Sequence, residues 1–364
     1  MLYLIFLSVV LVVFYTVLRL RNLDIWFWSY LKFMTKKLTR NKPKVTKVYF
    51  CIADHYEPYW GKATKEDAIR RVRRWHCEYI PQAEKYTDSD GNHPIYSFFY
   101  PAEEYDEEAM TMISDIVHKG FGDVEIHLHH EDDTAENLRT DLNDFIRVLD
   151  EKHNLLRRNE QGQLVYAFIH GNWALDNSHP DGAYCGVDNE LKVLEETGCY
   201  LDMTMPSAPD RTQTKKINSI YFAKGKAGVC KSHDKGVNVK PGRWQKEGEI
   251  LMVQGPLGFN WKRRKFGVLP RIEAGELSHD APPTKGRINL WLNYGARIEG
   301  VDDHIFIKLH THGANDKNLE MLLGGGLEGL WSNLDNMVCE NPEYSLHYVS
   351  ARGMYQKIKE LAIQ

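Results

Sequence analysis

The chain has 364 residues, of which 43% are hydrophobic and 26% are charged, and its formal net charge is −4. This length allows one large or two medium domains with a buried core. The small negative charge, without a basic face that carries interleaved aromatic side chains, argues against nucleic acid as a partner. The 9 Trp and 19 Tyr residues favour a carbohydrate partner, because aromatic rings can stack on sugar rings.

At the N-terminus, residues 2–18 form an uncharged and largely apolar run, just long enough to cross a bilayer as a helix. We predict a transmembrane anchor over residues 1–20 and a basic, aromatic juxtamembrane segment over residues 21–45. Because lysines and arginines follow the run, the positive-inside rule predicts a single-pass membrane protein whose catalytic domain is cytoplasmic. The aromatic patch Ile25–Leu31 is typical of a helix that lies on lipid headgroups.

Strand-like apolar runs recur along the rest of the chain, and each leads into histidine or acid: residues 48–53, 124–128, 164–169 and 304–309. Helix-like stretches lie between them, including residues 65–86, 107–119 and 136–158. Alternating strands and helices predict a parallel barrel or sheet. In such folds, ligands bind beyond the carboxyl ends of the strands.

Between about residues 205 and 286 the pattern changes to glycine, lysine and short β-like runs, without a long amphipathic helix. We predict a β-rich insertion there, within a catalytic domain over residues 46–364. The end of the chain returns to α/β character, with a strand-like run at 345–349 and a helix from about 353 to 362.

Three histidines and three carboxylates stand together between residues 127 and 133, at the end of one strand-like run. Nitrogen and oxygen donors behind a rigid element are how proteins hold divalent metals. Because the other runs end in the same residue types, we expect the strand ends to converge on a metal site. The alternative is that this polar segment only caps the helix that follows it.

Five segments stand in the order of the motifs of a known family: Ala53–His55, Glu125–His129, His170–Trp173, Gly198–Thr204 and Ile307–His310. This order resembles the polysaccharide deacetylase (NodB-homology) superfamily, over roughly residues 46–364. The second motif of that family ends in histidine, where this chain has Asp133. The resemblance implies a distorted (β/α)7 barrel and a metal-dependent deacetylase.

The first segment departs from the family, because the usual position of the catalytic base is occupied by Ala53, which cannot take a proton. In this register Asp54 is a metal ligand. If the register shifts by one residue, Asp54 becomes the base and His55 becomes the ligand. We predict three metal ligands, and one alternative to the last of them: Asp54, His129, Asp133, and His127. Three ligands leave the open position that a catalytic metal needs, and His127 faces the same side of a strand as His129.

For the catalytic acid we predict His310, with His312 as its alternate, because histidine titrates near neutral pH. The base stays open between Asp54, Glu57 and His55. The other strand ends supply candidates for substrate binding: His170, Asn172, Trp173 and Asp202. For Asp202 the alternative interpretation is a strand-end cap or turn residue.

Together these residues predict a membrane-anchored, metal-dependent hydrolase that removes the acetyl group from an N-acetylated sugar, in a glycan or in a lipid-linked or nucleotide-linked precursor. Histidine ligands favour zinc, and mixed His/Asp sites also accept cobalt, nickel, manganese or iron. One alternative is a glycoside hydrolase on the same barrel, which would use paired carboxylates. The other is a catalytically inactive binding subunit of a polysaccharide-synthesis complex, which Ala53 suggests.

Overall fold

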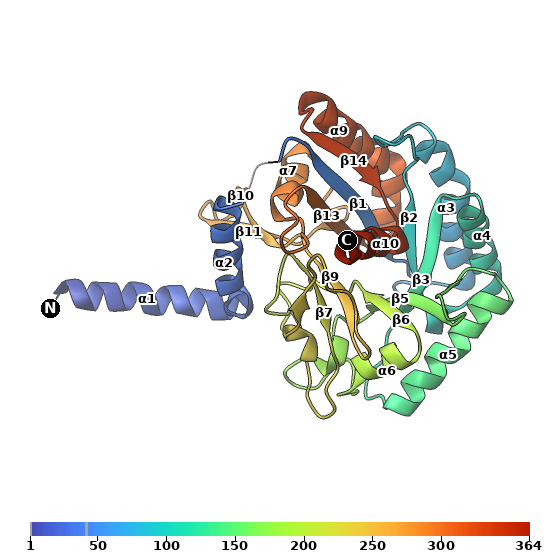
Figure 1. Ribbon diagram of the computed structural model, residues 1–364, viewed down its shortest axis with the longest axis horizontal. Coiled ribbons are helices and arrows are strands. Elements are labelled where there is room, and N and C mark those ends of the chain that lie inside the picture. Colours follow the sequence, from blue (N-terminus) through green and yellow to red (C-terminus); the bar gives the residue numbers. More distant parts are fainter. Residues whose placement is uncertain (1, 41–42) are drawn as a thin grey trace.

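The computed structural model describes residues 2–40 and 43–364 (Figure 1). Its core is a 12-stranded sheet with a run of parallel neighbours in the order β13, β1, β2, β3, β5, β6, β9. The bounds of these strands are β1 Thr46–His55, β2 Tyr96–Pro101, β3 Gly122–Leu128, β5 Leu164–His170, β6 Cys199–Asp202, β9 Ile250–Gln254 and β13 His304–Thr311. The predicted alternation of helices with parallel strands is therefore confirmed.

β1 is paired on both edges. Lys47 is its only exposed residue, so the strand is a nearly continuous buried run, as expected where both faces of a sheet are covered. Its first half pairs with β14 (Tyr344–Tyr348) and its last residues pair with β2, while β13 runs along the other edge. In this register Ala53 lies opposite His310, which brings the polar ends of β1 and β13 together.

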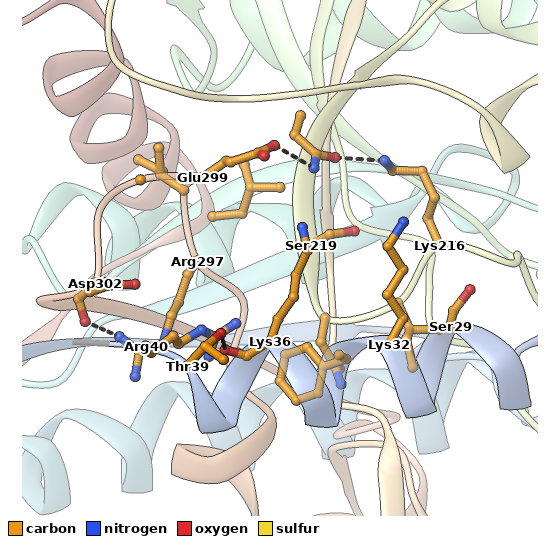
Figure 2. A pocket seen from close by; sticks show the side chains of 17 residues that line it. Ser29, Lys32, Lys36, Thr39, Arg40, Lys216, Ser219, Arg297, Glu299 and Asp302 are labelled. Carbon is orange, nitrogen blue, oxygen red and sulfur yellow. Dashed lines mark hydrogen bonds between the residues drawn. The ribbon is translucent and has the colours of Figure 1, made fainter. Parts of the chain in front are cut away.

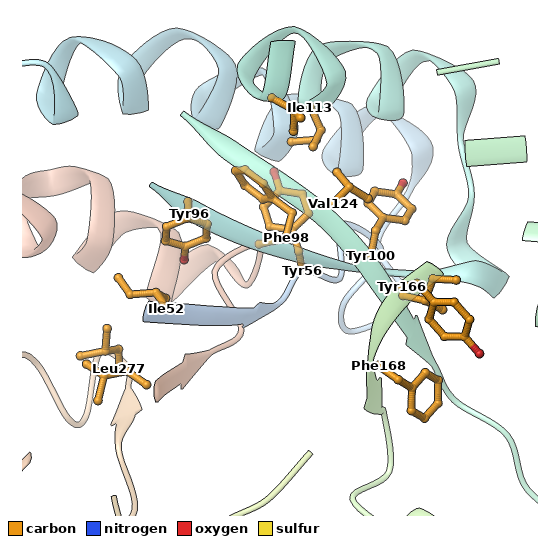
Figure 3. Packing of buried hydrophobic residues seen from close by; sticks show 14 of the residues in the cluster. Ile52, Tyr56, Tyr96, Phe98, Tyr100, Ile113, Val124, Tyr166, Phe168 and Leu277 are labelled. Carbon is orange, nitrogen blue, oxygen red and sulfur yellow. The ribbon is translucent and has the colours of Figure 1, made fainter. Parts of the chain in front are cut away.

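Helices cover one face of the sheet: α3 Lys65–Ala83, α4 Glu107–His118, α5 Ala135–Glu151, α6 Glu190–Glu196, α8 Asp316–Met321 and α9 Leu327–Glu340. The first three begin at side chains that accept backbone N–H groups of the first turn, Thr64, Asp106 and Thr134. Figure 3 shows Phe98 and Val124 of the sheet packed beneath Ile113 of α4.

A second apolar cluster fills the other face of the sheet. It joins Tyr49, Phe99, Ile169 and Phe222 of the strands to Met354 of α10 (Ala351–Ile363). Since side chains alternate along a strand, burial on both faces explains why the core strands carry apolar residues at consecutive positions.

The two ends of the sheet approach each other. In the part of the chain that the structure describes, β13 has β12 (Glu276–Leu277) and β1 as neighbours, and β9 has β6 and β7 (Ser219–Ala223), with β7 antiparallel to β9. Isolated bridges join Ser219 of β7 to Arg297, and Ala296 to Phe306 of β13, so residues 296–297 connect the two ends. The fold is a mixed α/β fold with one large, mainly parallel sheet.

The predicted fold class is wrong at the N-terminus. Residues Leu2–Leu20 form α1, but no helix within residues 2–40 and 43–364 has both the length and the apolar character needed to span a bilayer. At about 1.5 Å per residue, the uncharged run before Arg19 extends about 26 Å, less than the roughly 30 Å of a bilayer core. The predicted transmembrane helix and single-pass membrane localisation are therefore wrong. The cytoplasmic placement of the catalytic domain was inferred from that helix and is no longer supported.

The region predicted to be a β-rich insertion contains β7 to β12. β8 (Val237–Asn238) pairs with β7 in antiparallel orientation, and β10 (Gly258–Lys265) pairs with β11 (Leu269–Glu273) in a separate two-stranded sheet. β9, by contrast, belongs to the parallel core. The remaining elements are the short β4 (Arg157–Arg158) and α7 (Lys285–Tyr294). The domain boundaries stay a prediction.

The aromatic patch near the N-terminus packs on this domain. Trp26, just before α2 (Phe27–Leu38), stacks on Phe259 of β10 with 5.1 Å between ring centroids. Tyr30 meets the same ring edge-on at 4.9 Å. Trp28 points outward and is 70% exposed. The aromatic face of α2 therefore fixes this helix to the domain, and the opposite positions remain accessible.

Candidate metal centre

Three strand ends converge in a group of histidines. His55 ends β1, His127 is next to last in β3, and His310 is next to last in β13. Because these strands are parallel, their carboxyl ends lie along the same edge of the sheet. The ring centroid of His55 lies 4.9 Å from that of His127 and 4.8 Å from that of His312. Glu57, two residues beyond β1, completes the group.

Glu57 and His127 present lone pairs to each other. Nδ1 of His127 lies 3.1 Å from the carbonyl oxygen of Ile169 and donates to it, so a neutral ring has its lone pair on Nε2. This Nε2 lies 2.9 Å from Oε1 of Glu57. Two acceptors at this distance repel each other unless a cation lies between them, either a second proton on His127 or a metal ion.

The surroundings of His55 favour a metal ion over a second proton on His127. Both of its ring nitrogens are buried without a hydrogen-bond partner among the described residues, which is costly for polar atoms. One ligand atom from each of His55, Glu57 and His127 lies within 4.8 Å of the others. Two histidines and a glutamate form a known ligand set of catalytic zinc sites, which keep a fourth position open. These three residues therefore fit a divalent metal ion.

The protonation states suit this role. Burial lowers the pKa of His55 well below its ordinary value, and His127 and His312 lower it further, so the ring stays neutral. Burial opposes ionisation of Glu57, but the neighbouring rings of His127 and His129 outweigh burial and hold its pKa below the ordinary value. A neutral imidazole and an ionised carboxylate are the forms that bind metals.

His129 lies at the rim of the group as a bridge between two carboxylates. Its Nδ1 is 2.5 Å from Oε1 of Glu103, and its Nε2 is 3.3 Å from Oε1 of Glu57. Burial lowers the pKa of His129, but the two carboxylates outweigh burial and raise this pKa to about 10. The ring packs on Gly171, where any side chain would overlap it. His129 is therefore protonated, and a protonated ring cannot ligate a metal.

Asp54 faces away from the candidate metal group. Its carboxylate accepts hydrogen bonds from the hydroxyl of Tyr96 at 2.9 Å and from the backbone N–H of Gly313 at 2.7 Å. A Cβ at Gly313 would overlap this carboxylate, so the position requires glycine. Asp54 thus fixes the loop that follows β13 and carries His312, while its neighbour His55 faces the metal group.

A second buried group lies next to the first and includes residues from distant segments: His130, His170, Cys185 and Glu190. Both oxygens of Glu190 have donors. Oε1 lies 3.2 Å from Nε2 of His130. Oε2 accepts from the backbone N–H of Asp176 at 2.6 Å and from the thiol of Cys185 at 3.4 Å.

The proton on His170 weakens this second group as a metal site. Nδ1 of His170 accepts a hydrogen bond from the backbone N–H of Asn172 at 3.2 Å, so a neutral ring carries its proton on Nε2. That nitrogen lies 3.9 Å from Oε2 of Glu190. Burial lowers the pKa of His170 to about 3, which keeps the ring neutral with this one proton. A protonated Nε2 is not available as a ligand.

A cavity of about 210 Å³ lies against the candidate metal group and is lined in part by His310, His312 and Trp173. Burial lowers the pKa of both histidines, so they are neutral at pH 7. Trp173 has a φ of 62°, in the left-handed region, and its ring lies 4.6 Å from that of His55. Such backbone strain is common where a side chain is held at a functional site. Trp60 stacks on His312 at 4.9 Å.

The other predicted residues lie elsewhere. Oδ2 of Asp133 is 3.3 Å from Nδ1 of His130, in the second group. Asn172 donates to the backbone oxygen of His130 at 3.4 Å. Asp202 is buried and accepts from the hydroxyl of Thr204 at 2.7 Å, and burial raises its pKa to about 7. From the predicted set, the structure brings together His55, Glu57, His127, His129, His310, His312 and Trp173.

Sequence reasoning missed four residues in or beside these two groups: Glu103, Trp60, Cys185 and Glu190. Glu103 follows the apolar strand β2, in the same arrangement that led to the other strand ends, so this signal was present in the sequence. Trp60 and Glu190 carry no such signal. Glu190 begins α6 and reaches the second group only through the folding of the loop before it.

Comparisons with known proteins add one structural similarity. No family model matches this sequence, and no curated protein matches it. Among solved structures, the chain is similar to one described as "putative polysaccharide deacetylase from Mycobacterium smegmatis", with 11% sequence identity and a TM-score of 0.42. The match covers 88% of this chain and 92% of that chain. A similarity of this extent assigns no activity, so the function has to be argued from the geometry of the site.

Proposed function

We propose that this protein is a metal-dependent hydrolase that removes the acetyl group from an N-acetylated sugar. The observation that carries the proposal is the pair of facing lone pairs on Glu57 and His127, beside a buried His55 without partners. A divalent metal ion satisfies all three groups, whereas a second proton on His127 leaves His55 unsatisfied. Zinc suits the donors best, and cobalt, nickel, manganese and iron are compatible with them.

Other residues of the chain have proton-transfer and positioning roles in this proposal. When bound, the metal supplies polarisation of the amide carbonyl and activation of water at neutral pH. His310 and His312 are neutral at the cavity, so either ring can accept a proton and return it to the departing amine. His310 lies opposite Ala53, so a histidine supplies the proton acceptor that alanine cannot. Protonated His129 holds Glu57 in place.

The proposed substrate class rests on the aromatic wall and on the motif order. Trp60 is 40% exposed beside His312, and Trp173 lies 5.2 Å from His310 between ring centroids, so both rings border the cavity histidines. Aromatic faces of this kind can bind sugar rings. A glycoside hydrolase needs a carboxylic acid that stays protonated. The lowered pKa of Glu57 makes this residue unsuitable as that acid.

Metal content of the full-length chain is the first test, measured by elemental analysis after reconstitution with Zn²⁺. We expect about one metal per chain in the wild type and little in His55→Ala or His127→Ala. Cys185→Ser, in the second buried group, is the matched control and should keep its metal. Loss of metal from Cys185→Ser but not from His127→Ala would move the site to the second group.

Release of acetate from N-acetylated sugar oligomers is the second readout. The zinc-loaded wild type should release acetate, and both histidine variants should not. A metal-loaded protein that binds these sugars without releasing acetate would favour a binding subunit. New reducing ends instead of acetate would favour a glycoside hydrolase.

A further inference from the structure

A second cavity, of about 460 Å³, lies between α2 and the domain (Figure 2). Its walls come from four separate parts of the chain: α2 with the two residues after it, residues 216–220 at the start of β7, Asn238 of β8, and residues 297–300 and 302 before β13. None of these residues lines the cavity beside the candidate metal group. This basic pocket is therefore a separate feature of the molecule.

The pocket concentrates positive charge in a chain whose formal net charge is −4. Five cationic side chains line it: Lys32, Lys36, Arg40, Lys216 and Arg297. The lining contains two acids, Glu299 and Asp302. Lys32 and Lys36 are one helical turn apart on α2, and Figure 2 shows them extending toward the same space as Lys216.

Two of these cations are held in place by neutral acceptors. Nζ of Lys216 donates to the side-chain oxygen of Asn238 at 2.6 Å, and Asn238 in turn donates to Glu299 at 2.8 Å. Arg297 donates to the backbone oxygens of Asp302 and His304. Neutral acceptors orient a cation without cancelling its charge, so the pocket keeps a positive potential.

The cations also interact unfavourably with one another. Burial lowers the pKa of Arg297 to about 10, and repulsion by Arg40 lowers it further, whereas Asp302 opposes this shift. Burial likewise lowers the pKa of Lys216, Glu299 opposes this shift, and repulsion from Lys36 and Lys32 adds to it. Folding therefore brings together cations that are partly desolvated and mutually repelling, and an anion bound among them would relieve both costs.

The side chains of the lining restrict which kind of anion can bind. Apolar side chains form one part of the wall, from Phe33, Ile217, Ile220 and Ile298. Ser29 and Ser219 add hydroxyl groups beside the lysines. Lysine ammonium groups with nearby hydroxyls suit the oxygens of a phosphate, and apolar contacts suit an organic group attached to it.

From this arrangement we infer that the basic pocket binds a phosphate or diphosphate group on an organic carrier. The ligand carries at least two negative charges, which lie among Lys32, Lys36 and Lys216, and its carrier lies along Phe33 and Ile298. The same chemistry can come from a free phosphorylated metabolite or from a phospholipid headgroup. This inference does not depend on the proposed hydrolase activity, because the two cavities share no residue.

Binding of inorganic pyrophosphate to the full chain, measured by calorimetry, is the first arm of the test. The second arm is co-sedimentation with phosphatidylcholine vesicles that contain or lack phosphatidic acid. The test variant is Lys32→Gln/Lys36→Gln, which changes exposed side chains on α2. The control is Lys262→Gln/Lys265→Gln, which removes the same charge from exposed positions on β10. Thermal unfolding of both variants checks that α2 stays docked.

We expect saturable binding of at least one probe, weakened about tenfold or more in the α2 variant and nearly unchanged in the β10 variant. Pyrophosphate binding with this pattern identifies a free phosphorylated ligand. Binding restricted to phosphatidic acid vesicles, with the same pattern, identifies a headgroup. If neither probe binds, or if both variants weaken binding equally, the pocket has no specific phosphate site and the inference is wrong. If the α2 variant unfolds early, Lys216→Gln takes its place with the same expected pattern.

Discussion

The two buried histidine groups contain similar residues but differ in where their protons lie. In the first, Glu57 faces a lone pair of His127, and His55 has two ring nitrogens without partners among the described residues. In the second, each oxygen of Glu190 has a donor, and His170 carries its proton on the nitrogen that faces inward. By composition the second group, with four possible ligands, is the stronger metal site. Hydrogen bonding reverses this ranking, because a metal needs lone pairs that are free.

The largest expected effect comes from replacing the glutamate of each group with glutamine. Glu57→Gln should lower kcat/KM for acetate release by about 1000-fold or more and abolish metal binding, because it removes the anionic ligand. Glu190→Gln is the matched change in the second group. It should keep the metal and cost about 1–3 kcal/mol of unfolding free energy, since it replaces a buried acceptor oxygen of Glu190 with an amide donor. The reverse pattern would exchange the roles of the two groups.

Removal of the metal should lower the free energy of unfolding only where the first group is intact, so stability measurements also distinguish the two groups. Chelation should abolish acetate release and lower the free energy of unfolding by about 4 kcal/mol, if the ion is present at roughly 1000 times its Kd. Denaturant titrations with chelator and with Zn²⁺ measure this. Cys185→Ser should show the same gap between the two conditions, and His55→Ala should show almost none. A gap that persists in His55→Ala would contradict the assignment.

Asp202 tests whether buried carboxyls near the second group are structural. Burial raises its pKa in the folded protein to about 7, and the charge of Glu190 adds to this. Between the unfolded value and about pH 7, the folded state therefore holds a proton that the unfolded state has lost. Stability should fall as pH rises through this window, by about 2 kcal/mol between pH 5 and 7. Denaturant titrations of Asp202→Asn should lack this component, and an unchanged pH dependence would contradict it.

The smallest effect is expected at Asp54, which positions the loop of His312 without touching the metal group. Asp54→Asn keeps an oxygen for Tyr96 or for the N–H of Gly313 but replaces the second carboxyl oxygen with an amide donor. We expect metal content to stay near the wild-type value while kcat falls about 10–100-fold, as for other residues that act through a ligand or catalytic group. Loss of metal in this variant would instead make Asp54 a ligand.

Much of the fold could be predicted from the sequence because the signals are local. The helices at 65–83, 107–118 and 135–151 and the strand at 344–348 follow from periodicity and capping residues. The connection between the two ends of the sheet could not be predicted, because it depends on single bridges from Ala296 and Arg297 to two strands that lie far apart in the sequence. The membrane anchor was predicted from an apolar run whose length is marginal for a bilayer.

The candidate site could be predicted only in part. Strand ends located His55, His127 and His310, because parallel strands bring their carboxyl ends together. The choice between Asp54 and His55 depends on which face of β1 meets the other strand ends, and a one-residue shift reverses this face. The role of His129 depends on Glu103, whose contact across the rim is not encoded locally.

X-ray diffraction of zinc-soaked crystals, recorded on both sides of the zinc absorption edge, would locate the bound metal. We expect one strong anomalous peak among the side chains of His55, Glu57 and His127. A peak among His130, Cys185 and Glu190, or no ordered zinc in either group, would contradict this expectation.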